Sequence, residues 1–402
     1  MQFKNANKKS ISNRIINIAI IAVSIGITII IIAISTGKGL QEKIKSKTVA
    51  FNGHISVMPF ENNESQISVL PFEDDLNLRK IIKKNNAVNI INSVAFDGVI
   101  LKKENDFEGG IFKGVDSNYN WKVIKEFLIE GNYPEINKKS ISKEIILSKI
   151  MAKRLSLELG DNVDLYFQNS KNQKIPYKSR FKIVGLFNSG FPDIDNNLIY
   201  GDIDQIRRVN KWEKNKTGSY EIFIDNIYNS DKISKKIYND LPSNLDSISI
   251  SKKYKSTFQW IALFDFNILI ILIIVIIVSV VNLSTAILIL IFERSKMISL
   301  LKTMGLKNNK IKKIFLWSGL LIISRGLLIG NFFGLLFFFI QKKYALIKLD
   351  PETYFVEVAP VIISLSEILF TNILFIIVCT FLLWIPLNII LKISPSKSLR
   401  FR

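Results

Sequence analysis

Few residues of this chain could carry out catalysis by the common side-chain chemistries. Its 402 residues include one histidine, His54, and one cysteine, Cys379. A metal site built from His and Cys needs several such ligands, so a site of that kind is strongly disfavoured. The same scarcity argues against His-dependent acyl or phosphoryl transfer, and it rules out a disulfide within the chain. We therefore expect no catalytic residue, metal ligand or cofactor.

Carboxylates and phosphate-binding glycines also lack the spacing that chemistry requires. No GxxxxGK[ST] loop occurs, and residues 37–39 (GKG) lack its spacing, so we expect no ATP binding by a Walker motif. Asp74-Asp75 and the pair Asp193 and Asp195 are typical of turns and surfaces, because no nucleophile, base or metal partner accompanies them. Weak calcium binding at Asp193 and Asp195 has no EF-hand pattern to support it. The sequence predicts a protein that is not an enzyme.

One stretch has the character of a binding surface. The uncharged segment 266–292 is followed by ERSKMISLLKTMGLKNNKIKKIF, which has seven Lys and Arg residues and one acid. Apolar residues recur in it at helical spacing, and a glycine provides a stop. We predict a short amphipathic helix on the cytoplasmic face, suited to the membrane surface or to a groove on a partner. The residues assigned to this surface are Glu293, Arg294, Met297, Leu300, Leu301, Met304 and Gly305.

Four apolar segments indicate a membrane protein. The chain is 48% hydrophobic but 22% charged, which favours four spans with one large soluble domain. Most basic residues flank the spans, so the net charge of +20 follows the positive-inside rule and does not indicate nucleic acid binding. The predicted order is a cytoplasmic N-terminus (1–14), a first span (15–36), an extracytoplasmic domain (37–262), a stalk with the second span (263–292), a cytoplasmic segment (293–314), a third span (315–340), an outer loop (341–367), a fourth span (368–391) and a cytoplasmic tail (392–402).

The first apolar segment has an alternative interpretation as a cleaved signal peptide. Ala33-Ile34-Ser35 weakly resembles a cleavage site. The apolar run is longer than the roughly 7–15 residues of a signal h-region, which favours an uncleaved span.

The outer domain mixes strand-like and helix-like segments, which indicates an α+β fold. Glycines near residue 110 and near Gly201 suggest subdomain boundaries. VDLYFQ and KSRFKIVGLF flank NSKNQKIPY, which predicts a long hairpin with an exposed tip. From Lys252 the chain shows no helix breaker, so we expect one continuous helix to lead into the second span.

The third span carries a helix-packing pattern and a charge. Gly326, Gly330 and Gly334 are spaced four residues apart, and such small residues allow another helix to approach closely in lipid. Arg325 lies beside them within an apolar run, and no acid within the spans can pair with it. Its alternatives are lipid phosphates, Asn282 or Asn331, or a second subunit.

The arrangement of one span, a large outer domain and three further spans resembles the type VII ABC transporter permeases, the MacB/FtsX-like superfamily. The resemblance covers nearly the whole chain. ERSKMISLLKTMGLKNNKIKKIF and the tail ISPSKSLRFR are similar to the cytoplasmic parts of that family. KEIILSKIMAKRLSLELGDNVDLYF and FKIVGLFNSGFPDID resemble its Sabre subdomain, at about 111–200, inserted in a Porter subdomain at about 37–110 and 201–262.

Within this superfamily the chain is most similar to the lipoprotein-releasing LolC/LolE type. KIPYKSRFKIVG resembles the end of the Hook of that type, and LDPETYFVEVAP resembles its last outer loop. The resemblance implies a Hook that binds a periplasmic lipoprotein carrier, although its tip is otherwise poorly matched. The implied Hook residues are Asn169, Lys171, Gln173, Ile175, Pro176 and Tyr177.

The resemblance implies a permease subunit of the cell inner membrane, with both termini in the cytoplasm and the large domain in the periplasm. Its implied partners are a cytoplasmic ABC ATPase dimer, a second permease subunit (the same chain or a paralogue), a lipoprotein substrate and membrane lipids. ATP hydrolysis by the partner would drive lipoprotein release mechanically. The alternatives are a MacB-type efflux permease, an FtsX-like regulator of a cell-wall hydrolase, and a membrane enzyme with its active site in the outer domain.

Overall fold

The structure is a computed structural model that describes residues 11–63, 65–137, 140–168, 176–354 and 356–392. The chain divides into two compact units, which are described separately. One contains residues 1–42, 261–348 and 358–402, and the other contains residues 43–260 and 349–357. The fold class predicted from the sequence, four membrane-spanning helices with a large α+β domain, is confirmed.

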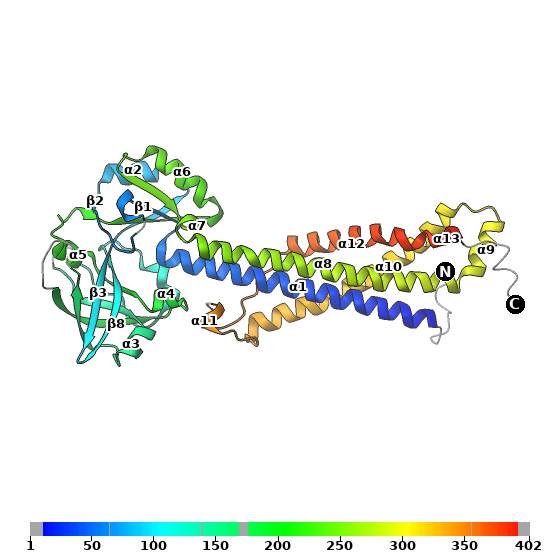
Figure 1. Cartoon of the computed structure of the whole chain (residues 1–402), viewed down its shortest axis with the longest axis horizontal. Helices are drawn as coiled ribbons and strands as arrows, with labels where there is room; N and C mark the ends of the chain where they lie inside the picture. Colours follow the sequence, from blue (N-terminus) through cyan, green and yellow to red (C-terminus); the bar gives the residue numbers. More distant parts are fainter. Residues whose placement is uncertain (1–10, 64, 138–139, 169–175, 355, 393–402) are drawn as a thin grey trace. The chain divides into compact units, whose positions relative to one another are not determined.

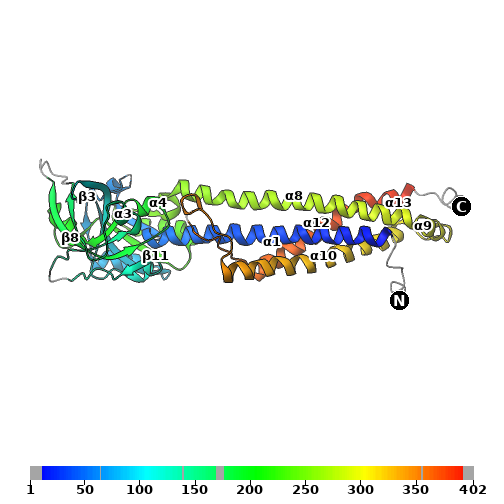
Figure 2. The same cartoon turned by 90° about the horizontal axis from the view of Figure 1, so that it is seen from below.

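The first unit is a bundle of long apolar helices. Four described helices are long and apolar enough to cross a membrane, and they run along one direction in Figures 1 and 2. They are α1 (Ile11–Asn52), α8 (Lys255–Glu293), α10 (Asn308–Tyr344) and α12 (Leu365–Leu387), and the short helices of this unit are α9 (Ser295–Thr303) and α13 (Ile389–Lys392). Both α1 and α8 also extend into the second unit.

Helix α10 packs on α1 through its three glycines. A Cβ at Gly330 would lie 2.7 Å from the backbone oxygen of Ser24, and those at Gly326 and Gly334 would meet Val23 and Ile31 just as closely. The Thr28 hydroxyl lies 3.1 Å from the Gly330 carbonyl, which accepts its hydrogen bond. This glycine face is therefore filled by α1 of the same chain, so a second subunit would have to use a different surface. These three glycines therefore leave no free face for the predicted contact with a second subunit.

Polar contacts add to the bundle at two further places. Asn331 of α10 and Asn372 of α12 exchange amide hydrogen bonds of 3.3 and 3.1 Å, and such pairs hold helices together in lipid. Helix α12 begins with a capping box formed by Ser364 and Glu367, and Lys38 of α1 forms an ion pair with Glu367. These contacts place α1, α10 and α12 together as one packed group.

The second unit is built on a 10-stranded mixed sheet. Its order is β12-β1-β11-β3-β4-β9-β6-β8-β5, with β7 pairing with both β3 and β8. A separate pair is formed by β10 and β2. The strands are β1 (Ile55–Pro59), β2 (Phe72–Glu73), β3 (Val88–Lys103), β4 (Asp106–Val115), β5 (Leu128–Gly131), β6 (Glu144–Ser148), β7 (Asn162–Phe167), β8 (Tyr177–Phe187), β9 (Leu198–Asp202), β10 (Lys216–Thr217), β11 (Ser219–Ile224) and β12 (Leu245–Ser249).

Short helices lie between these strands. Helices α2 and α6 contact each other, and α5 packs on β3, β4 and β9 (Figure 1). The α-helices of this unit are α2 (Leu76–Lys83), α3 (Lys149–Arg154), α4 (Pro192–Asp195), α5 (Ile203–Val209), α6 (Ser230–Asp240), α7 (Ile250–Lys253) and α11 (Pro351–Tyr354). The 3-10 helices are η1 (Phe60–Asn62), η2 (Trp121–Phe127) and η3 (Ile227–Asn229).

Strand β3 connects β12, β1 and β11 on one side of the sheet with β4 and the strands beyond it on the other. Its first half pairs with β11 and its second half with β7, while β4 follows its other edge. The predicted subdomain boundaries near 110 and 201 fall inside β4 and β9, which are neighbours in this sheet. The division into Porter-like and Sabre-like subdomains remains a prediction.

The strand pairing of the predicted hairpin is confirmed, and its predicted exposed tip lies outside the described residues. Strands β7 and β8 pair antiparallel, from Asn162 opposite Lys182 to Phe167 opposite Tyr177. The predicted continuous helix from Lys252 is wrong, because the backbone leaves the helical region at Tyr254 (φ −110°, ψ 47°) and α8 begins at Lys255. The Tyr254 hydroxyl donates a 2.6 Å hydrogen bond to Asn52 Oδ1, which holds this break against the end of α1.

A buried ion pair lies at the centre of the second unit. Lys113 of β4 and Glu221 of β11 are 0% and 2% exposed, and their charged atoms are 2.6 Å apart. Lys113 Nζ also donates a 2.8 Å hydrogen bond to the Phe51 carbonyl in the last turn of α1. Burial lowers the pKa of Lys113, and the charge of Glu221 opposes this effect. One ammonium group thus joins two strands and a helix end.

We predict that Gly330→Val destabilises the bundle. The added side chain would meet the Ser24 backbone, and overpacking of this kind costs about 1–3 kcal/mol. The measurement is thermal unfolding of the purified chain in detergent. Ser324→Val, an exposed position on the same helix, is the matched control and should change the midpoint little. Equal midpoints for the two variants would contradict the packing role of Gly330.

We also predict that Lys113→Met lowers the free energy of unfolding by about 3–5 kcal/mol, because Glu221 is left charged and buried. The double variant Lys113→Met, Glu221→Leu should recover most of this loss, since it removes both charges. Lys149→Met, which breaks the exposed pair with Glu130, is the control and should cost less than about 1 kcal/mol. A loss in the double variant as large as in the single one would argue against an electrostatic cause.

Candidate functional site

The segment between α8 and α10 forms the short helix that its sequence predicts, which is α9. Helix α9 starts after a bend at Arg294 and stops at Gly305, which has a positive φ of 84°. Gly305 N–H donates to the Lys302 carbonyl and Leu306 N–H donates to the Leu301 carbonyl, the two bonds of a Schellman motif. Glycine at this position avoids the steric strain of the left-handed conformation.

Helix α9 has one apolar face that is exposed and one that is buried. Met297, Leu300 and Met304 are 39%, 54% and 76% exposed, which is unusual for large apolar side chains on one face. Ile298 is fully buried, and Leu301 packs partly buried against the core of the bundle. Leu301 therefore supports the helix from inside, whereas the other three predicted apolar residues form an outward stripe.

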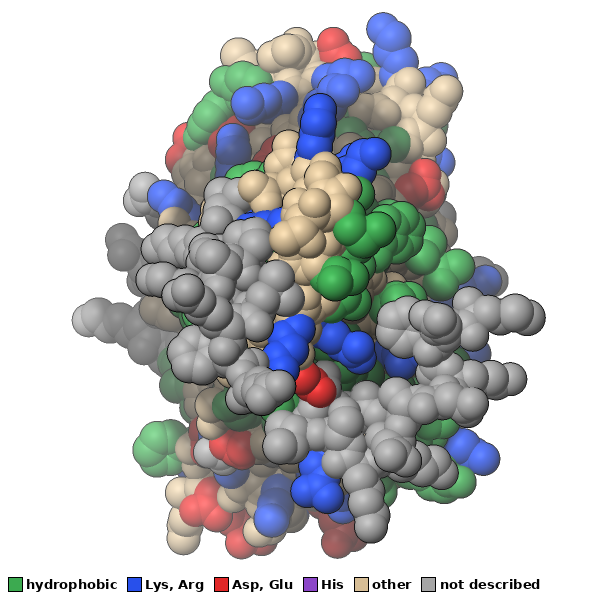
Figure 3. Space-filling view, turned by 90° about the vertical axis from the view of Figure 1, so that its right-hand side faces the viewer, with side chains coloured by type: hydrophobic (Ala, Val, Ile, Leu, Met, Phe, Trp, Pro, Cys, Tyr) green, Lys and Arg blue, Asp and Glu red, His purple; other side chains and the backbone are tan. Residues whose placement is uncertain are grey.

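Basic side chains lie beside this stripe. Arg294 and Lys296 are exposed before it, next to the exposed acid Glu293, and Lys307 and Lys310 are exposed after it. Figure 3 views the end of the bundle that carries α9 and shows hydrophobic and basic side chains next to one another. Such a surface can bind a groove that is apolar at its centre and acidic at its rim.

One lysine of α9 and one lysine of α10 bind residues that follow the fourth long helix. Lys302 Nζ donates a 2.7 Å hydrogen bond to the Ile390 carbonyl in α13, and Lys312 Nζ donates one of the same length to Asn388 Oδ1. These contacts could not be predicted from the sequence, because both lysines look like ordinary members of a basic cluster. A displacement of α9 would act on α13 through Lys302, as well as on its sequence neighbours α8 and α10.

Arg325 lies on the exposed face of α10. Within the described part of the chain, no hydrogen bond or ion pair to Arg325 is found. Asn331, one of its predicted partners, pairs with Asn372 instead. Asn282, the other predicted partner within the chain, forms no hydrogen bond with Arg325 either, which leaves lipid phosphates or a second subunit as its predicted partners.

Most of the predicted Hook lies outside the described residues, namely Asn169, Lys171, Gln173 and Ile175. Pro176 is exposed, and Tyr177 begins β8 with its ring 5.0 Å from the Arg208 guanidinium. The described strands β7 and β8 therefore fix both ends of the segment.

The pattern of the MacB-like periplasmic core domain family matches residues 18–228, which is just over half of the chain. The pattern of the FtsX-like permease C-terminal family matches residues 269–395. The lipoprotein-releasing system transmembrane protein LolC of Buchnera aphidicola subsp. Schizaphis graminum is 26% identical over 96% of this chain and 93% of its own. LolE of Haemophilus influenzae is 21% identical over 94% of this chain and 92% of its own.

Among solved structures, the periplasmic region of MacB from Actinobacillus actinomycetemcomitans is similar to this chain, with 11% identity and a TM-score of 0.35 over 52% of this chain and 95% of its own. The family matches cover both the sheet domain and the last three long helices. The resemblance seen in the sequence is thereby confirmed. This chain belongs to the MacB/FtsX-like superfamily of ABC transporter permeases, with a MacB-like periplasmic core domain and an FtsX-like permease C-terminal region.

Proposed function

We propose that this chain is a permease subunit that couples a separate cytoplasmic ATPase to the release of lipoproteins from the inner membrane. The observation that carries this proposal is the nearly full-length similarity to proteins named as transmembrane parts of lipoprotein-releasing systems. Efflux of the MacB type and regulation of a cell-wall hydrolase are the alternatives. Both would use the same fold with different partners.

The proposed contact with the ATPase dimer is the stripe of Met297, Leu300 and Met304, together with the flanking charges of Glu293 and Arg294. This stripe is apolar and exposed, as a docking helix requires. It supports an orientation in which α9 and both termini face the cytoplasm and the sheet domain faces the periplasm, as the basic residues near the spans favour.

In the proposed cycle, ATP-driven movement of α9 reaches the spans by two routes. One route is α8, which runs without interruption from Glu293 to Lys255. The other is the hydrogen bond from Lys302 of α9 to Ile390 of α13, next to the bond from Lys312 of α10 to Asn388, the residue between α12 and α13. The substrate leaves from the outer leaflet and does not cross the membrane. A second permease subunit, either the same chain or a paralogue, completes the transporter.

Leu300→Asp should abolish co-purification of the ATPase with this chain. Burial of a leucine at an interface contributes about 1.5–3 kcal/mol, so losing it and adding a charge should weaken binding at least about tenfold. Thr303→Asp places the same charge on an exposed position of the same helix and is the matched control. Pull-down from solubilised membranes measures the effect. Undiminished recovery of the ATPase with Leu300→Asp would exclude this stripe as the docking site.

The proposed Hook can be tested by photocrosslinking in cells from a benzoylphenylalanine at Ile175. A crosslink to a small soluble periplasmic carrier is expected, and the same probe at the exposed Lys125 should give none. A crosslink to an efflux adaptor or to a hydrolase would overturn lipoprotein release in favour of that alternative. With the chain folded and its ATPase bound, the absence of any crosslink would remove the assignment of the Hook.

A further inference from the structure

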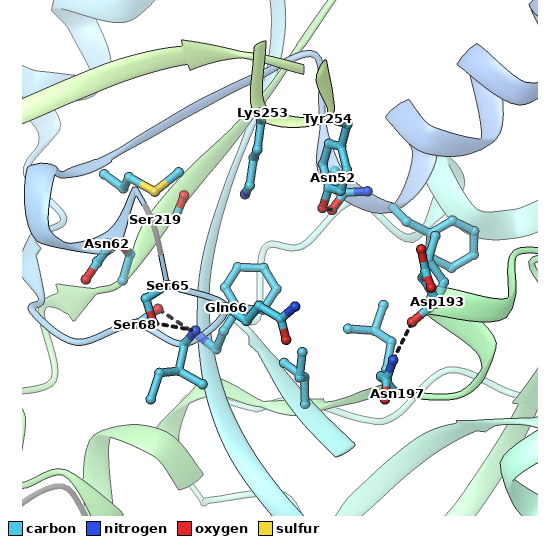
Figure 4. Close-up of a pocket in the computed structure, with 18 of the residues that line it drawn as sticks. Asn52, Asn62, Ser65, Gln66, Ser68, Asp193, Asn197, Ser219, Lys253 and Tyr254 are labelled. Atoms are coloured by element: carbon cyan, nitrogen blue, oxygen red, sulfur yellow. Dashed lines mark hydrogen bonds between the residues drawn. The ribbon is translucent and has the colours of Figure 1, made fainter. Parts of the chain in front are cut away.

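The sheet domain contains a half-open cavity of about 500 Å³, within the size range of small-ligand sites. It is lined by the last turns of α1, by the loop at residues 65–68, by β3, by α4 and by the start of α8. In Figure 4, Lys253 and Gln66 point into the cavity from opposite walls, and Asp193 and Asn197 lie together at a different side. All of these residues belong to the second unit.

The lining of this cavity carries one basic and one acidic side chain, Lys253 and Asp193, on different sides. Lys113 and Lys253 lie 5.7 and 6.0 Å from the centre of the same Phe96 ring, and among the described residues Glu221 is the carboxylate that acts on both ammonium groups. Glu221 is already bonded to Lys113. No hydrogen bond or ion pair joins Lys253 Nζ to another residue that the structure describes, and the side chain is exposed.

The surroundings of Lys253 also favour an anionic ligand. Surrounding protein atoms lower the pKa of Lys253, Glu221 opposes this effect, and Lys113 adds to it. The Tyr254 ring lies 6.0 Å from the same ammonium. An anion entering the cavity would stabilise the charged form of Lys253.

The rest of the lining indicates what kind of molecule carries that anion. The Gln66 carboxamide forms no hydrogen bond to a described residue and can both donate and accept. Hydroxyl and amide side chains alternate with the rings of Phe51, Phe96 and Phe191. An acyl chain would need a more uniformly apolar lining, whereas a peptide offers backbone amides and small apolar groups together.

We propose that this cavity binds a short acidic peptide segment, with a carboxylate on Lys253 and a backbone amide on Gln66. The acidic side chain lies at the Lys253 end because Asp193 would repel it at the other. The site is a recognition site in the sheet domain and is separate from the stripe on α9 and from the Hook. It does not depend on the identity of the transported substrate.

The test uses the full chain in detergent and two photoreactive peptides, acetyl-Gly-Ser-Asp-Ser-benzoylphenylalanine-amide and the same peptide with Asn in place of Asp. The Asp peptide should label cavity residues at least about tenfold more than the Asn peptide, because a charge-assisted hydrogen bond is lost in the latter. Mass spectrometry maps the labelled residues. Equal labelling by the two peptides, or labelling that maps outside the cavity, would overturn the proposal.

Lys253→Met should reduce labelling by the Asp peptide to the level of the Asn peptide. Lys252→Met removes the adjacent exposed lysine, which does not line the cavity, and should leave labelling unchanged. Equal losses in both variants would contradict a specific site. If Lys253→Met unfolds, the comparison of the two peptides on the unaltered chain still decides. Displacement of the Asp peptide by laurate would show an acyl-anion site and would overturn the peptide assignment.

Discussion

The sheet domain depends on an ion pair that is removed from water. Lys113 and Glu221 are both buried, and each would be costly to bury without the other. Because Lys113 also binds the Phe51 carbonyl, the pair fixes the last turn of α1 against β4 and β11. The break at Tyr254 is held to Asn52 one residue further along α1. The two chain segments that enter the domain are therefore anchored within a few residues of one another.

The helical bundle follows a different physical rule. Apolar side chains gain little from leaving lipid for each other, so close backbone approach and polar contacts must hold the helices. The glycines of α10 provide the close approach to α1, and the Asn331–Asn372 pair provides the polar contact with α12. Elsewhere on its surface, α1 meets α8 at Gly26 and Gly37, where added Cβ atoms would lie 2.7 and 2.8 Å from Val275 and Ile268.

The sequence predicted the features that depend on local patterns. Long apolar runs indicate spans, and two strand signals around a polar turn indicate the β7–β8 hairpin. Contacts between distant segments have no such pattern. Lys113 looks like any lysine in a strand, and only the fold shows that it is buried beside Glu221. Likewise, Leu301 shares its helical spacing with Leu300, but it faces the bundle because α9 packs on its Ile298 side. The glycine spacing indicates a packing face, but it does not identify the helix that packs on it.

Helices α9 and α10 each bind the chain beyond α12 through a lysine and an uncharged acceptor. Lys302 binds a backbone carbonyl and Lys312 binds a carboxamide, and neither acceptor carries a charge or gains a proton near neutral pH. Exposed ion pairs weaken as salt rises, because mobile ions screen both members. These two contacts have a single charged member each, so the attachment of α9 to α13 and of α10 to Asn388 should change little with the ionic strength of the surrounding solution.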